Sequence, residues 1–393
     1  MKHWLRRTWA EIDLDALRDN FKRIRFATEA DCRVMAVVKA DAYGHGAVLA
    51  AETLEAAGAD WFAVSNLDEA LQLRDAGITR PILILSYTPP EEAAVLSEAD
   101  VTQTVVSADH AKALSDAAAE AGVTLRVHIK LDTGMSRVGF FCQADDDVLI
   151  AAEQIAEAAA LPALEAEGIF THFTSADEPN GEAQTRAQYD RFCRVIDALA
   201  EKGITFRLRH CCNSAATLRF PDMHLDMVRP GVILYGLYPD GWMRSLLPLQ
   251  PVMSLKTRVS QTKTVPAGTA VSYGRAYTAE RAVSLATVPI GYADGYTRRA
   301  SGKAFMLIHG EPAPVRGRIC MDQCMLDISG VQGVAAGDVA TAFGQSDGTF
   351  LPVETYASWS DTINYEIVCA IGKRVPRLFL RGGQPVYVRD DLI

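Results

Sequence analysis

Short apolar runs alternate with helix-like stretches through the first part of the chain. The apolar runs have the length and the Val, Ile and Phe content of buried strands, and they occupy residues 33–39, 61–65, 81–87, 102–107, 124–132, 167–173, 206–212 and 224–230. Helical periodicity fills the intervals, as in LDEALQLRDAG and EAQTRAQYDRFCRVIDALAEKG. Eight strands, each followed by a helix-like segment, predict an α/β fold, a (β/α)8 TIM-type barrel over residues 14–244. A doubly wound sheet is the alternative, but KADAYGHG after the first strand is not G-x-G-x-x-G.

The pattern changes after residue 245. Prolines, glycines and β-branched residues dominate there, in segments such as SLKTRVSQTKTVPAGTAVSYG and KAFMLIHGEPAPVRGRICMDQCMLDIS. Short alternating runs between Gly and Pro turns predict a second, mainly β domain over residues 245–393. Another strand-like piece, TWAEIDL (8–14), precedes the barrel, so we interpret residues 1–13 as an N-terminal strand that could pair with the β domain.

Composition narrows the classes of function. Of 393 residues, 49% are hydrophobic, and the net charge of −10 without a long basic run argues against nucleic acid and anionic membranes as partners. No apolar run approaches the ~20 residues of a membrane span. The first residues, MKHWLRRTWAEIDLD, lack the apolar core of a signal peptide. The eight cysteines form no C-x2-C pair, so we interpret them as free thiols of a cytoplasmic protein.

Polar side chains follow the predicted barrel strands. In barrel enzymes the chemistry gathers at the carboxyl ends of the strands, so these side chains should share one rim. They are Lys39 at strand one, Lys130 and Asp132 with Arg137 beyond them at strand five, His172 at strand six, Asn213 and Ser214 after strand seven, and Arg229 at strand eight. Each has an ordinary reading alone, since a strand-end lysine can snorkel and Ser214 can be a helix N-cap. Their convergence favours a catalytic use.

A lysine, two arginines and a histidine on one rim, without an H-x-H metal pattern, fit chemistry on an aldehyde cofactor. A neutral lysine amine condenses with an aldehyde. The common aldehyde cofactor, pyridoxal 5′-phosphate (PLP), needs this lysine, a phosphate cradle and a partner for its ring nitrogen. Ser214 and the backbone N–H groups of Gly231 and Val232 are candidates for the cradle, because the loops after strands seven and eight are the favoured phosphate site of such barrels.

Nine segments together resemble the alanine racemases. They run in that family's order across residues 36–368: AVVKADAYGHG, KLDTGMSRVGF, THF, NSAATLRFP, RPGVILYG, VSYGRAYTA, IGYADGY, GRICMDQCMLDI and TINYEIV. The resemblance implies a PLP-binding barrel followed by a β domain. It also implies a homodimer whose sites are shared between chains, and interconversion of L- and D-alanine for peptidoglycan synthesis.

The resemblance assigns the reaction to two bases. Lys39 would bind PLP through its amine and act as the base on one face of the substrate. Tyr273 of the partner subunit would be the base on the opposite face. Arg229 would contact the pyridine nitrogen, and His172 would lie beside it and help to hold its orientation.

The resemblance also assigns binding residues. The phosphate would be held by Tyr43, Ser214, Gly231, Val232 and Tyr365. Arg137 would bond the cofactor's phenolic oxygen and help bind the substrate carboxylate, which Met321 of the partner would also reach. Lys130 matches a lysine that many members carry as a carbamate, which orients the arginine matching Arg137. Asn213, Tyr292 and Asp322 would support the site.

The chemistry explains this choice of groups. Racemisation removes a proton from one face of Cα and returns one to the other, and bases on opposite faces do this without turning the substrate. An arginine at the ring nitrogen stays protonated, so that nitrogen must accept a hydrogen bond. The cofactor is then a weaker electron sink, which should limit side reactions such as transamination.

Other readings share parts of this pattern. A PLP-dependent decarboxylase has the same two-domain plan but pairs the ring nitrogen with a carboxylate, whereas MVRPG supplies Arg229. A non-catalytic PLP carrier is usually a single domain, which leaves the β domain unexplained. A broader or serine-preferring racemase stays open. Tyr292 and Tyr365 stand where the family narrows its pocket, but a small pocket rejects one extra hydroxyl by only ~10²-fold.

Overall fold

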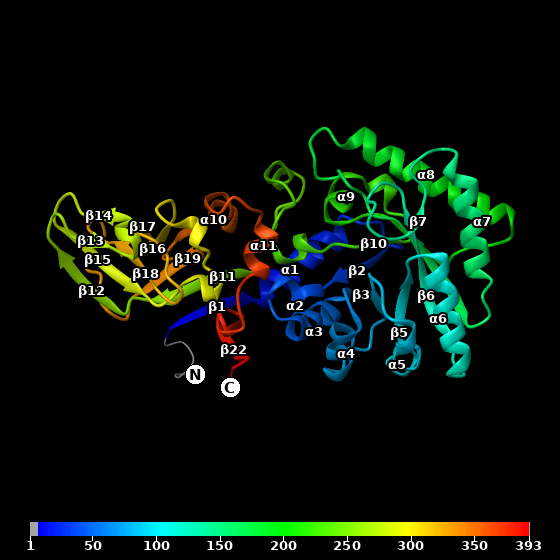
Figure 1. Ribbon diagram of the computed structural model, residues 1–393, viewed down its shortest axis with the longest axis horizontal. Coiled ribbons are helices and arrows are strands. Elements are labelled where there is room, and N and C mark those ends of the chain that lie inside the picture. Colours follow the sequence, from blue (N-terminus) through cyan, green and yellow to red (C-terminus); the bar gives the residue numbers. More distant parts are fainter. Residues whose placement is uncertain (1–6, 393) are drawn as a thin grey trace. The chain divides into compact units, whose positions relative to one another are not determined.

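The computed structural model describes residues 7–392 and divides into two units (Figure 1). One unit comprises Leu17–Ala42 and Ala47–Gln250. The other contains the chain from Pro251 onward, the segment that ends at Ala16, and Tyr43–Gly46. Within residues 7–392, no helix combines the length and the apolar character needed to cross a bilayer.

The first unit is a nearly closed barrel of eight parallel strands, which confirms the predicted fold class. The strand order is β10-β2-β3-β4-β5-β6-β8-β9. The bounds are β2 Arg33–Val37, β3 Trp61–Val64, β4 Ile82–Ile84, β5 Val101–Val105, β6 Leu125–Asp132, β8 Leu164–Phe170, β9 Leu208–His210 and β10 Met227–Val228, with the short β7 (Phe140–Phe141) beside β6. Backbone hydrogen bonds from Asp226 N to Arg209 O and from Arg229 N to Cys212 O bridge the gap between β9 and β10.

Helices surround the barrel strands (Figure 1). Their bounds are α1 Leu14–Phe26, α3 Ala47–Ala57, α4 Leu67–Asp75, α5 Ala93–Glu98, α6 Ala108–Glu120, α7 Asp147–Ala159, α8 Glu182–Glu201 and α9 Ser214–Arg219. Several begin at a side chain that accepts a hydrogen bond from the first helical turn. Ser107 accepts from His110 N before α6, which explains why that helix starts where it does.

The second unit is mainly β. Its large sheet has the order β12-β15-β18-β17-β16-β19-β11-β1-β21-β22, with β20 beside β19. The first strand, β1 (Thr8–Asp13), belongs to this sheet, antiparallel to β11 (Met253–Arg258) and parallel to β21 (Arg377–Arg381). The other bounds are β12 Gln261–Val265, β15 Val283–Val288, β16 Phe305–Ile308, β17 Glu311–Arg316, β18 Cys324–Asp327, β19 Val339–Ser346, β20 Thr349–Leu351 and β22 Gln384–Arg389.

Smaller elements of this unit complete it. The two-stranded pair β13 (Ala270–Val271) and β14 (Tyr277–Thr278) flanks the short turn η6 (Tyr273–Arg275). A second turn, η7 (Tyr292–Asp294), follows β15, and the helices are α10 (Val353–Trp359) and α11 (Asn364–Cys369). The turns η6 and η7 carry two of the residues that the resemblance assigns to the site.

Candidate active site

Lys39 begins a left-handed turn at the carboxyl end of a barrel strand. The sequence predicts that strand through Lys39, but β2 stops at Val37 and Lys39 opens the five-residue element α2 (Lys39–Tyr43). Residues 40–43 all have φ between 52° and 54°. This conformation costs about 1–2 kcal/mol per non-glycine residue, so the chain turns here against its local preference. Such strain is typical of functional sites.

Side chains and backbone groups stabilise the turn. Ala40 N donates to Glu69 Oε1 at 2.7 Å, and Asp41 Oδ1 accepts from Ala47 N at 2.8 Å. Ala42 N donates to Val38 O at 2.8 Å. These hydrogen bonds hold the backbone of the turn that begins at Lys39.

Four basic residues of the barrel unit act electrostatically on the buried His172. Burial lowers the pKa of His172 well below its ordinary value, and the charges of Arg229, Lys130, Arg137 and Lys39 lower it further. Lys39 follows β2, Lys130 and Arg137 lie on and after β6, and Arg229 follows β10, so the barrel brings them together. Four of the predicted rim residues are therefore within electrostatic reach of one imidazole, which is neutral at pH 7.

The Asp132 carboxylate accepts hydrogen bonds from the backbone of the loop that leads to Arg137. Its Oδ1 accepts from the backbone N–H groups of Gly134, Met135 and Ser136 at 3.1, 2.8 and 3.0 Å. The carboxylate thus orders the turn after β6, and the surroundings of His172 remain strongly positive.

Lys130 is a buried lysine near the carboxyl end of β6. Its Nζ donates to Leu131 O at 3.1 Å and lies 5.1 Å from the centroid of the Phe170 ring. Burial lowers the pKa of Lys130 well below the ordinary 10.5, and Arg229 lowers it further against the opposing charge of Asp132. The uncharged amine is the form that reacts with electrophiles such as CO2.

Arg229 is held by an imidazole and two carbonyl groups. Its Nη1 donates to His210 Nδ1 at 2.8 Å, and its Nη2 donates to Thr171 O at 2.8 Å and Cys211 O at 3.1 Å. Burial lowers the pKa of Arg229 to about 10, so it is still protonated at neutral pH. The sequence assigned the orienting role to His172, but the imidazole that contacts Arg229 is His210. His210 lies in the predicted strand FRLRHCC, and nothing in that segment indicates its partner.

The predicted phosphate cradle comes together after β9 and β10. Gly231 N donates to Ser214 Oγ at 2.8 Å, although the two residues belong to different loops. The N-cap of α9 is Asn213, whose Oδ1 accepts from Ala216 N at 3.0 Å, so the local reading of Ser214 as the cap is wrong. Ser214 is the first helical residue, and its hydroxyl lies beside the turn that begins with Val232.

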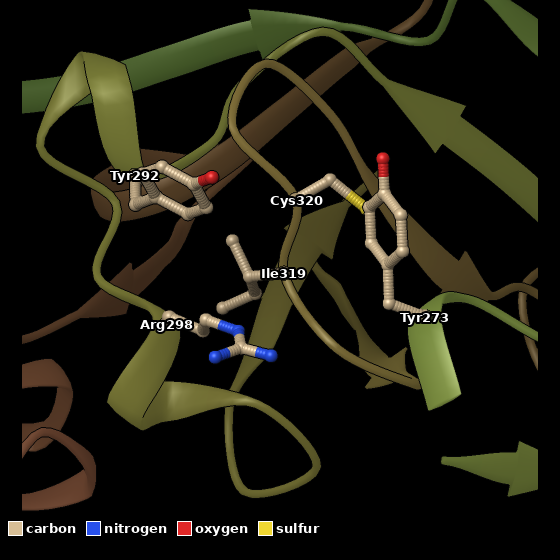
Figure 2. Close-up of a pocket in the computed structure, with 5 residues that line it drawn as sticks. All are labelled: Tyr273, Tyr292, Arg298, Ile319 and Cys320. Atoms are coloured by element: carbon tan, nitrogen blue, oxygen red, sulfur yellow. The ribbon is translucent and has the colours of Figure 1, made fainter. Parts of the chain in front are cut away.

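Two predicted residues of the β unit line a cavity of about 540 Å³ (Figure 2). Tyr273 and Tyr292 lie on either side of Ile319, and Arg298 and Cys320 complete the lining (Figure 2). Both tyrosines are exposed, Tyr273 by 70% and Tyr292 by 44%.

Other predicted residues of the β unit are held by their neighbours. Met321 is 51% exposed, and the next residue, Asp322, accepts from Arg374 Nη2 at 2.8 Å. The rings of Tyr43 and Tyr365 have centroids 6.1 Å apart. Burial raises the pKa of the Tyr43 phenol, which therefore stays protonated as a hydrogen-bond donor.

The donor set fits PLP, an anionic aldehyde. A phosphate requires hydroxyl and backbone N–H donors, which Ser214 and the turn after Gly231 supply in one place. The ring nitrogen requires a donor that stays charged, which Arg229 supplies. The aldehyde requires an amine, and Lys39 lies within electrostatic reach of the same imidazole as Arg229.

Comparison with known sequences identifies proteins that this chain resembles. The family profile described as alanine racemase, N-terminal domain, matches residues 12–239, and alanine racemase, C-terminal domain, matches residues 252–379. An alanine racemase of Desulfovibrio desulfuricans is 48% identical over 375 residues, which cover 95% of this chain and 98% of the relative. An alanine racemase of Methanococcus maripaludis is 44% identical over 373 residues, with the same coverage.

Solved structures give the same result. The alanine racemase of Clostridium difficile 630 has a TM-score of 0.91 at 40% identity and covers 98% of this chain and 99% of its own. The alanine racemase of Bacillus anthracis with bound L-Ala-P has a TM-score of 0.92 at 38% identity and covers 98% of both chains. The chain therefore belongs to the alanine racemase family.

Proposed function

We propose that this chain interconverts L- and D-alanine with PLP and that two bases, Lys39 and the partner subunit's Tyr273, move the Cα proton. The observation that supports this most strongly is the pair of groups at the ends of β9 and β10: Arg229, held by His210, Thr171 and Cys211, and Ser214 Oγ against Gly231 N. When bound, PLP supplies the electron delocalisation that makes the Cα–H bond acidic. The protein supplies the bases, the anion-binding groups and a fixed position for each.

Different barrel residues would bind the phosphate, the ring nitrogen and the substrate carboxylate. Ser214 Oγ and the backbone N–H groups at the turn from Gly231 to Val232 would hold the phosphate, and the resemblance adds the hydroxyls of Tyr43 and Tyr365. Arg229 would donate to the ring nitrogen. Arg137 would pair with the substrate carboxylate. It is positively charged, and it follows the loop that the Asp132 carboxylate orders after β6.

The two bases would act on opposite faces of Cα. Lys39 Nζ would remove the proton from one enantiomer, and the hydroxyl of the partner subunit's Tyr273 would deliver a proton to the other face. In the reverse direction the two groups exchange these tasks. Neither base has to cross the substrate, so racemisation needs no rotation of the bound molecule.

We further propose a homodimer in which each site takes residues from both chains. Tyr273, Tyr292 and Met321 are large side chains exposed by 70%, 44% and 51% on the β unit. The resemblance assigns Tyr273 and Met321 to the partner's site and places Tyr292 where the family narrows its pocket, and a two-fold dimer would use the same surface twice. Exposure that is costly on a single subunit then becomes contact area in the dimer.

The product would be D-alanine for peptidoglycan. We place the reaction in the cytoplasm, because the eight cysteines of residues 7–392 form no disulfide there, as is typical of a reducing compartment. Alanine would be the main substrate and serine a slower one, since a small pocket rejects one hydroxyl by only ~10²-fold.

The test is a polarimetric assay of the purified protein loaded with PLP. The proposal expects L-alanine and D-alanine to reach the same end point of zero rotation. The Lys39→Ala variant is the control and should leave the rotation unchanged. Constant rotation with PLP demonstrably bound to the wild-type protein would contradict the proposal.

A further inference from the structure

A row of buried polar groups runs from Arg229 through the interior of the barrel. The Nη1 atom of Arg229 lies 2.8 Å from His210 Nδ1, and His210 Nε2 lies 2.8 Å from His128 Nδ1. The Nε2 atom of His128 lies 3.6 Å from Glu167 Oε1. We name Glu167, His128, His210 and Arg229 the polar row.

The polar row crosses the inside of the barrel. His128 is on β6 and His210 is on β9, and β8 separates these strands in the sheet. The ring of His128 also lies 5.4 Å from that of Trp61 on β3, which is three places away from β6 in the strand order. Contacts between strands that are not neighbours can form only across the interior.

A β-bulge places Glu167 beside His128. On β6 and β8, Val127 pairs with Ala166 but the next residue, His128, pairs with Gly168, so Glu167 is the extra residue. A bulge of this kind redirects a side chain. A Cβ atom on Gly168 would come within 2.7 Å of three atoms of the His128 ring, so only glycine leaves room for that imidazole.

The protonation pattern of the polar row follows from Arg229, because a guanidinium can only donate. His210 Nδ1 must therefore accept, which places the proton of a neutral His210 on Nε2. That N–H donates to His128 Nδ1, which places the proton of His128 on Nε2. His128 Nε2 makes no hydrogen bond, and the Glu167 carboxylate, 3.6 Å away, is the charge that attracts its proton.

The charges agree with this pattern. Burial lowers the pKa of His128 and of His210, so both are neutral at pH 7. Burial raises the pKa of Glu167, but His128, Arg207 and Thr102 outweigh this and bring it below the ordinary value, so Glu167 is ionised. Thr102 Oγ1 donates to Glu167 Oε1 at 3.1 Å, and Arg207, which is exposed and precedes β9, pairs with Oε2.

We propose that Glu167 is a positioning residue for Arg229, which it holds through the fixed tautomers of His128 and His210 as a donor to the PLP ring nitrogen. This inference rests on the proposed function. A carboxylate behind a histidine commonly sets the orientation and basicity of the ring. Here two imidazoles carry that effect from the amino end of the barrel to the group at its carboxyl end.

The experiment compares PLP binding by the full-length wild-type protein with that by Glu167→Gln. The dissociation constant of PLP and the absorption band of the bound cofactor are measured by titration of the apoprotein, and melting of the apoprotein is measured separately. We expect Glu167→Gln to weaken PLP binding about 10-fold, the loss typical of an orienting carboxylate behind a histidine, and to shift the band. Apoprotein melting should change little.

A matched control separates positioning from stability. Glu165→Gln changes an exposed carboxylate two residues away on the same strand. It should bind PLP as the wild type does. Thr102→Val removes one donor to Glu167 and should weaken PLP binding by less than the ~10-fold expected for Glu167→Gln, because the carboxylate itself remains.

Unchanged PLP affinity and absorption in Glu167→Gln would overturn the proposal, whatever happens to the melting temperature. If Glu167→Gln does not fold, Thr102→Val decides, and unchanged PLP binding there would also overturn it. Failure of the proposed function looks different, because the wild-type protein itself would then not bind PLP or would not racemise alanine.

Discussion

The guanidinium of Arg229 donates to an imidazole nitrogen of His210 at 2.8 Å. Its other hydrogen bonds go to carbonyl oxygens, and within residues 7–392 no carboxylate forms an ion pair with it. Even with a pKa lowered to about 10 by burial, the group stays charged at neutral pH. A ring nitrogen that faces such a donor accepts a hydrogen bond and is not protonated, which connects the barrel interior to the chemistry of the cofactor.

Replacement of Arg229 with Glu should increase transamination. A carboxylate can share a proton with the ring nitrogen, which strengthens the cofactor as an electron sink and allows protonation at the wrong carbon. We expect racemisation to slow. The amount of pyridoxamine phosphate formed per racemisation event should rise by at least about tenfold, the change that corresponds to a rise of one unit in the pKa of the ring nitrogen. Arg229→Lys keeps the charge and is the control. Equal side-product ratios in all three proteins would contradict this account.

Lys130 should react with CO2. Burial and the neighbouring Arg229 favour its uncharged amine, and the product carbamate would bear a negative charge among cations. We expect a carbamate signal in the carbon NMR spectrum after incubation with ¹³C-bicarbonate, and no such signal in Lys130→Ala. A wild-type protein without the signal would show that this lysine stays unmodified.

Subunits that lack different bases should complement each other. Lys39→Ala and Tyr273→Phe should each lose activity by about 10²–10⁴-fold, the usual contribution of a general base. Co-refolded at equal amounts, they should recover about a quarter of wild-type activity, because half of random two-fold dimers are hybrids with one intact site of two. No recovery despite dimer formation would mean that both bases of a site come from one chain.

Acid should destabilise the fold below pH 6.5. His128 and His210 are fully buried, and their folded pKa values lie below the ordinary 6.5. Between those lowered values and 6.5 the unfolded chain binds protons that the folded chain does not, so stability falls as pH falls and is unaffected above this window. Each histidine contributes a slope of up to about 1.4 kcal/mol per pH unit. Urea midpoints at pH 5.5 and 7.5 measure it, and His210→Gln should show a smaller difference; equal midpoints would contradict the prediction.

Loss of the Asn213 cap should affect both stability and cofactor binding. Asn213→Ala should cost about 1 kcal/mol of stability, as an N-cap does, and should weaken PLP binding because α9 begins at Ser214. Ser107→Ala removes the cap of α6 and is the matched control, with a similar loss of stability and normal PLP binding. If both variants bind PLP normally, Ser214 does not depend on this cap.

The apolar runs predicted most strands well, because parallel barrel strands are buried on both faces. The prediction 124–132 corresponds to β6 at Leu125–Asp132. The strand predictions are wrong at ends where the tertiary structure overrides the local preference of the sequence. The end of β2 at Val37 depends on the left-handed turn, and the start of β8 at Leu164 was missed because Glu165 and Glu167 interrupt the apolar pattern at a bulge.

The candidate site, like the strands, could be predicted from the sequence only in part. Residues at strand ends could be placed on one rim from the fold alone, and the structure brings Lys39, Lys130, Arg137 and Arg229 around His172. The role of His210 was not predictable, because a histidine in an apolar strand gives no sign of its partner. Tyr273 is an ordinary turn tyrosine in the sequence, and only the resemblance assigned it a role.

The most direct test of the two-base account is incubation of the PLP-loaded protein with L-alanine in heavy water. Optical rotation and incorporation of deuterium at Cα are followed together, with L-serine for comparison. The account predicts that rotation decays to zero as deuterium enters Cα, faster for alanine than for serine. Deuterium incorporation with retained rotation would contradict it, because only one face of the substrate would then meet a working base.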